Sequence, residues 1–196
     1  MKILITICVV TMLIALIIVF KDEMFKVKEN ILDNEKFYMD YPKVSVDNVY
    51  KYITAKEAIN IFENGTGIIL FGFKECVWCQ SYAPLLNKLA KDKGIDTIYY
   101  VDIKEDRSMN TEEYKTLTTI LSNYLYDDSK GNKRIYVPDV YFVSQGEILG
   151  HNNDTSTEEG KDIEYYYTQN EETLKTKLNE LLDKMPKTCN DNEKGC

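Results

Sequence analysis

The apolar positions of this chain change their spacing along its length, and the spacing predicts the structural elements. Residues 1–20 are uncharged from residue 3 on, and this apolar run is just long enough to span a bilayer as a helix. Residues 21–44 mix charge with few apolar positions, as expected of a tether. From residue 45 on, short apolar runs alternate with segments of helical spacing. This alternation predicts one α/β domain over 45–186, followed by a short tail at 187–196.

Strands and helices are expected in turn within the domain. Thr54 and Glu57 stand at the spacing of a capping box, which marks the start of the first helix. Further helices are expected from Cys76 to about Lys93, from Asn110 or Thr111 to Leu125, and over 171–185. Apolar runs predict strands within 46–53 and at 68–71, 98–103, 136–143 and 148–150. Polar stretches at 127–133 and 151–164 are expected to be loops, and 165–167 an edge strand or a segment packed on the last helix.

The charge balance excludes one class of function. The chain carries a formal net charge of −8 at pH 7, and its basic residues do not gather in a patch. We therefore expect no nucleic-acid partner. The abundance of Lys, Asn, Ile and Tyr is typical of an AT-rich genome and indicates a bacterial source.

The five cysteines are distributed unevenly. Cys8 lies in the apolar run, where we interpret it as an apolar filler. The other four form two close pairs, Cys76 with Cys79 and Cys189 with Cys196, as expected of an exported domain that tolerates disulfides. A structural Cys189–Cys196 disulfide that ties down the tail is the favoured interpretation. The alternative is a pair that relays electrons to Cys76 and Cys79.

The N-terminal run is interpreted as a signal-anchor. It ends in Val19-Phe20-Lys21, which lacks the small residues of a cleavage site. Lysines flank it on both sides, and their count slightly favours a cytoplasmic domain. The cysteine pairs favour the opposite side. We expect a single-pass protein of the cell membrane with its domain outside the cytoplasm.

Cys76-Val77-Trp78-Cys79 lies where the 68–71 strand meets the next helix. Because a helix N-terminus favours a thiolate over a thiol, Cys76 is expected to attack a disulfide. Cys79, one turn further on, can then reach the first sulfur. Half of a zinc site has the same spacing. A second such pair is missing, however, and His151 is the single histidine. No metal or cofactor is therefore predicted, and a static disulfide is the remaining alternative.

Two prolines complete a pattern around these cysteines. Pro84 lies within the helix that Cys76 opens, and Val137-Pro138 precedes a strand and a turn at Gly146. Together with the cysteines and the order of elements over 45–185, these positions resemble the thioredoxin family. The resemblance implies a thioredoxin-like fold, in which a central mixed sheet is flanked by helices.

The resemblance also implies roles for single residues. A cis Val137–Pro138 bond is expected to present the Val137 backbone to an extended substrate peptide. Trp78 is expected to contact substrate beside Cys76 or, nearly as plausibly, to pack on the domain. Thioredoxins carry a buried acid six residues before the first cysteine, where this chain has Leu70. Lys74 should favour a Cys76 thiolate and Glu75 should oppose it.

These observations predict thiol–disulfide exchange on exported proteins or peptides, in either direction, with a redox partner protein. Within the superfamily, the N-terminal run and the extended third-helix region resemble small membrane-anchored bacterial proteins linked to bacteriocin export. The alternative is a non-catalytic accessory protein that uses the same fold to bind an exported peptide or a transporter. His151 is expected to be an exposed or hydrogen-bonded surface residue.

Overall fold

The structure of the protein is a computed structural model, and it describes Met12, residues 32–153 and residues 163–186. The predicted signal-anchor, apart from Met12, and the tail with Cys189 and Cys196 lie outside the described residues. In the described parts of the chain, no helix is both long enough and apolar enough to cross a bilayer.

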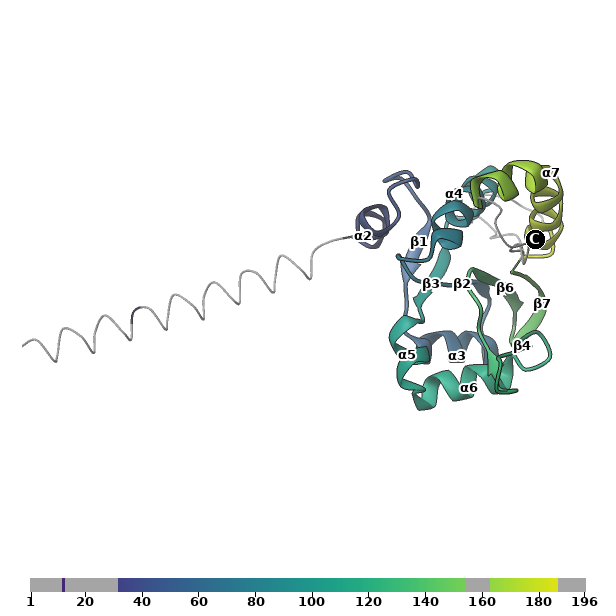
Figure 1. Ribbon diagram of the computed structural model, residues 1–196. Helices are drawn as coiled ribbons and strands as arrows, with labels where there is room; N and C mark the ends of the chain where they lie inside the picture. The colour runs from purple at the N-terminus through teal and green to yellow at the C-terminus, as the bar shows by residue number, and fades with distance from the viewer. Residues whose placement is uncertain (1–11, 13–31, 154–162, 187–196) are drawn as a thin grey trace, which may run out of the picture.

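The centre of the domain is a five-stranded mixed sheet (Figure 1). Its strand order is β1-β3-β2-β6-β7, in which β1, β3 and β2 run parallel and β6 and β7 run antiparallel to their neighbours. This arrangement, with helices on both faces, matches a thioredoxin-like fold as predicted. The strands are β1 (Tyr50–Tyr52), β2 (Gly67–Gly72), β3 (Ile98–Asp102), β6 (Asp139–Ser144) and β7 (Glu147–Asn152).

Two helices cover each face of the sheet, so the strand at its centre is buried on both sides. Helices α3 (Ala55–Asn64) and α6 (Glu112–Ile120) pack on one face, and α4 (Val77–Asp92) and α7 (Ile163–Leu182) pack on the other (Figure 1). Strand β2 is apolar without interruption because alternate residues point into the two cores. Its side chains Ile69 and Phe71 enter the α3/α6 core, and Ile68 and Leu70 enter the α4/α7 core.

The predicted capping box is confirmed. The Glu57 N–H donates to the Thr54 hydroxyl at 3.2 Å, and the Glu57 carboxylate accepts from the Thr54 N–H at 2.8 Å. Two of the N–H groups left without helical partners are satisfied in this way, which fixes the start of α3. Helix α3 therefore begins at Ala55 and leads directly into β2.

The largest difference from the prediction lies in the expected tether. Residues 33–40 form a helix, α2 (Asp33–Asp40), which packs against β1 (Figure 1). Phe37 and the following Tyr41 are fully buried in the α4/α7 core, with their rings stacked at 4.4 Å. The folded domain therefore begins about a dozen residues before the expected boundary at 45. One buried aromatic in a polar helix leaves almost no periodic signal, so tertiary packing decides the structure here.

Smaller differences concern the polar segments. A short helix, α5 (Lys104–Met109), precedes α6, which ends at Ile120 rather than Leu125. The expected loop at 127–133 is bounded by a small hairpin of β4 (Tyr126–Asp127) and β5 (Lys133–Arg134). Helix α7 begins at Ile163, well before the expected start at 171, so residues 165–167 are helical and not an edge strand.

Candidate active site

The junction of β2 and α4 places both cysteines as predicted. Strand β2 ends at Gly72, a turn follows, and Cys76 is the N-cap of α4. The Cys76 sulfur accepts the Cys79 N–H at 3.2 Å, so the sulfur itself satisfies one of the unpaired amides at the helix start. This capping role points the Cys76 side chain at the positive end of the helix.

Both cysteines are free thiols, but their surroundings differ. Cys76 keeps 8% of its surface exposed, against 1% for Cys79. A hydrogen bond from the Cys79 thiol, helped by the Cys79 and Trp78 amides and the charge of Arg107, outweighs burial and lowers the pKa of Cys76 to about 7. Burial, reinforced by the hydrogen bond and the charge of Cys76, raises the pKa of Cys79. Near neutral pH the outer sulfur, Cys76, is therefore divided between thiolate and thiol, while Cys79 beneath it stays a thiol.

The segment before β6 faces the outer thiol. The Val137–Pro138 bond is cis, as expected, and the Val137 carbonyl accepts a hydrogen bond from the Cys76 thiol at 3.6 Å. Val137 is half-buried and Pro138 is buried. The predicted roles of Val137, Pro138 and Trp78 in substrate binding stay predictions. Trp78 is half-buried, with its ring edge-on to Tyr167 of α7 at 5.6 Å, so it packs on the domain.

The two charged residues that precede Cys76 both have partners of their own. Lys74 lies 3.4 Å from Asp40, and Glu75 forms an ion pair with Lys104 at 2.9 Å. Both pairs are exposed and weak. Among the influences on the Cys76 thiolate, the nearby cation is instead Arg107 of α5.

Arg107 bridges the two segments on either side of Cys76, and the sequence analysis did not single it out. Its Nη1 donates to the Ile135 carbonyl at 3.2 Å, and its guanidinium lies 5.0 Å from the centre of the Phe73 ring. Burial, together with the like charge of Arg134, lowers the pKa of Arg107. No local pattern marks this residue, because α5 is a short polar helix that the apolar spacing does not predict.

A pair of tyrosines lies beneath Cys79, close to the apolar Leu70. The hydroxyls of Tyr41 and Tyr100 are hydrogen-bonded at 2.8 Å, and both rings are buried. A Cβ on Gly72 would lie 3.0 Å from the Tyr100 ring, 3.2 Å from the Tyr41 hydroxyl and 3.5 Å from the Cys79 sulfur. A larger residue at this position would therefore have to push the tyrosine rings aside, because β2 passes close to both tyrosines and to the Cys79 sulfur.

A second polar cluster lies on the opposite face of the sheet. Asp139, fully buried directly after Pro138, accepts a hydrogen bond from the Tyr141 hydroxyl at 2.8 Å and lies 3.1 Å from His151 Nδ1. Burial raises the pKa of Asp139 to about 6, although both partners act to lower it. His151 is hydrogen-bonded, as predicted, but its partner is this buried acid and its ring stacks on Tyr141.

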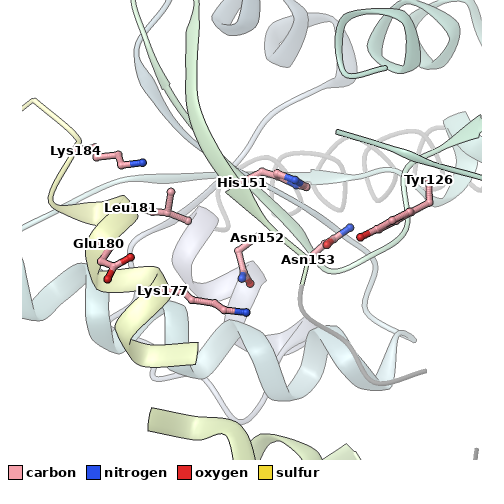
Figure 2. Close-up of a pocket in the computed structure, with 8 residues that line it drawn as sticks. All are labelled: Tyr126, His151, Asn152, Asn153, Lys177, Glu180, Leu181 and Lys184. Atoms are coloured by element: carbon pink, nitrogen blue, oxygen red, sulfur yellow. The ribbon is translucent and has the colours of Figure 1, made fainter. Parts of the chain in front are cut away.

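A polar cavity of about 380 Å³ opens between the end of β7 and α7. Figure 2 shows His151 and Asn152 on the strand side and Lys177, Glu180 and Lys184 on the helix side. Neither Cys76 nor Cys79 lines this cavity. The surface around Cys76 is therefore separate from this cavity.

Comparison with known proteins adds little beyond the fold. No family model and no curated protein matches the sequence. Among solved structures, oxidized thioredoxin O1 from Arabidopsis thaliana is 19% identical, with a TM-score of 0.34. The aligned region covers 64% of this chain and 97% of the thioredoxin chain. Thioredoxin O2 from the same plant, also oxidized, is 17% identical, with coverages of 64% and 94% and a TM-score of 0.35. Similarity at this level carries no argument about function.

Proposed function

We propose that the protein is a thiol–disulfide oxidoreductase in which Cys76 attacks and Cys79 resolves. The observation that carries this proposal is that the surroundings shift the pKa values of the two thiols in opposite directions. The sulfur that caps α4 is stabilised as a thiolate, while its neighbour one turn along is buried and stays protonated. A static structural disulfide would need neither a stabilised thiolate nor this difference between its two sulfurs.

The proposed cycle has two exchange steps. The Cys76 thiolate attacks one sulfur of a substrate disulfide, forms a mixed disulfide, and releases the other sulfur as a thiolate that takes a proton from solvent. Cys79 then loses its proton to solvent and attacks the Cys76 sulfur. The Cys76–Cys79 disulfide forms and the second substrate sulfur leaves. The substrate disulfide is reduced by two electrons and the cysteine pair is oxidised. Run in reverse, the same steps oxidise a dithiol.

The proposed substrates are proteins or peptides outside the cytoplasm, and a redox partner protein resets the cysteine pair. The apolar run in residues 1–20 and the paired cysteines support a membrane-anchored protein with an extracytoplasmic domain. The Val137 carbonyl, next to the Cys76 sulfur, supports docking of an extended chain through its backbone.

Insulin reduction and oxidative refolding of reduced ribonuclease test the proposal in the two directions. The full-length protein should catalyse at least one of them, and Cys76→Ser should abolish that activity. Cys79→Ala should accumulate mixed disulfides through Cys76. A Cys189→Ser/Cys196→Ser variant serves as the control and should stay active. No activity in either assay and no trapped adduct would refute the proposal and favour the non-catalytic accessory protein.

A further inference from the structure

Two arginines lie close to the segments that flank Cys76. Arg107 touches both segments beside Cys76, through the Phe73 ring and the Ile135 carbonyl. Arg134 is the neighbour of Ile135, and its guanidinium lies 5.5 Å from the centre of the Tyr136 ring. The two cations are close enough for Arg134 to lower the pKa of Arg107. They form what we call the arginine pair.

The anion near the arginine pair within the described residues is the Cys76 thiolate, whose pKa Arg107 helps to lower, and not a carboxylate. In the described residues, neither arginine forms an ion pair with a carboxylate; their polar and cation–ring contacts are to the Ile135 carbonyl, Phe73 and Tyr136. The nearest acid in sequence to Cys76, Glu75, is occupied by Lys104. Two like charges held together without a carboxylate repel each other, and an anion between them would remove that repulsion. Both side chains are partly exposed, so an anion from outside can reach them.

Exposed apolar side chains lie next to Cys76 and next to Val137 in the chain. Val77 next to Cys76 is 59% exposed, and Tyr136 next to Val137 is 41% exposed. A chain lying along Val137 would thus meet apolar surface and the arginine pair at once. From this placement we propose that the site selects peptide or protein substrates that carry a carboxylate beside the reacting cysteine. This inference depends on the proposed exchange function and names its substrate class.

The proposed contact acts on encounter and orientation, not on the exchange of electrons. A Glu or Asp next to the substrate cysteine would pair with the guanidinium groups while its sulfur meets the Cys76 thiolate. A Lys there would be repelled. Complementary charges at a partly exposed surface mainly raise the association rate, and salt screens the effect.

The test measures one exchange step with a series of matched peptides. The full-length protein is used with Cys8, Cys189 and Cys196 replaced by Ser and with Cys79→Ala, so that Cys76 is its single thiol. Short peptides carry one cysteine as a 2-thiopyridyl disulfide, with Glu, Gln or Lys beside it. Cys76 attacks the peptide sulfur, and the released pyridine-2-thione is followed by absorbance. The readout is the ratio of second-order rate constants for the Glu and Lys peptides.

We expect the Glu peptide to react about five- to tenfold faster than the Lys peptide at low salt, with Gln between them and the ratio falling as salt rises. Arg107→Gln and Arg134→Gln should each bring the ratio toward one, and Arg107→Lys should keep most of it. Lys133→Gln is the control, because that nearby cation already pairs with Asp127 at 3.2 Å; it should leave the ratio unchanged. A ratio taken within one variant is independent of how much thiolate that variant holds.

The outcomes separate the two proposals. If all three peptides react equally fast with the parent protein, the substrate preference is wrong while the exchange function stands. If the preference survives in both Arg107→Gln and Arg134→Gln, the arginine pair is not its cause. If no peptide reacts at any pH, the exchange function itself fails. Should Arg107→Gln not fold, the Arg134→Gln variant, changed on the separate β4–β5 hairpin, still provides the test.

Discussion

Replacing Cys79 with Ala should make Cys76 a weaker acid. The largest influence that lowers the pKa of Cys76 is the hydrogen bond from the Cys79 thiol. A hydrogen bond to a charged group contributes about 1.5–3 kcal/mol. Since one pKa unit corresponds to about 1.4 kcal/mol, the Cys76 midpoint should rise from about 7 by roughly one to two units. The thiolate fraction at pH 7 then falls about fivefold for a rise of one unit and about fiftyfold for a rise of two.

The assay is the pH dependence of iodoacetamide alkylation at Cys76, followed by mass spectrometry between pH 5 and 10. Cys79→Ala should alkylate more slowly near neutrality and reach the parent rate at high pH, where both are thiolates. Cys79→Ser is the matched control, because its hydroxyl still donates and should keep the midpoint low. An unchanged midpoint in Cys79→Ala would refute the reasoning. The amides at the start of α4 and the charge of Arg107 would then suffice to hold the thiolate.

The remaining predictions concern stability, measured by urea unfolding. In the parent protein, the Asp139 pKa raised to about 6 means that folding favours the protonated acid. This contribution to the free energy of unfolding is complete below about pH 4 and lost above about pH 6. Asp139→Asn does not titrate, so its stability relative to the parent should increase as pH rises, by up to about 3 kcal/mol. An equal effect of the mutation at pH 4.5 and pH 7.5 would contradict this. Phe37→Ala should lower the free energy of unfolding by about 3–5 kcal/mol if α2 belongs to the core. Met39→Ala, at a 60% exposed site of the same helix, should leave the free energy of unfolding almost unchanged. Similar losses in these two would place α2 outside the cooperative unit. Gly72→Ala should cost about 1–3 kcal/mol, since its Cβ would meet the Tyr100 ring at 3.0 Å; a neutral result would mean that the ring shifts freely.

The elements that could be predicted are those specified by neighbouring residues. The capping box at Thr54 and Glu57, the buried strand β2 and the Cys76 helix depend on local patterns, and the structure has all three. The spacing of two cysteines directly after a predicted strand is enough to predict that Cys79 lies in the first turn of α4, one turn from Cys76.

The parts that could not be predicted depend on contacts between distant segments. Arg107 reaches Phe73 and Ile135 only because α5 folds beside both. Asp139 is conspicuous after Pro138, yet its burial and its pairing with His151 follow from the register of β6 on β7. The local sequence does not contain this information, because each partner comes from another element of the sheet or from a loop between them.

Helix α2 has a geometric consequence for the protein as a whole. The Asp40 carbonyl accepts a hydrogen bond from Gln80 of α4 at 2.8 Å, and the Asn34 carbonyl accepts one from Asn48 at 2.8 Å. Both ends of α2 are thus tied to the domain, so the folded unit extends back to the beginning of α2. If residues 1–20 are inserted in a bilayer, only 21–31 are left to connect it to the domain. At about 3.3–3.6 Å per fully extended residue, that connection spans at most about 40 Å. The cysteines would then react only with partners that lie close to the lipid surface. Inserting residues into this connection would let them reach partners farther from the bilayer.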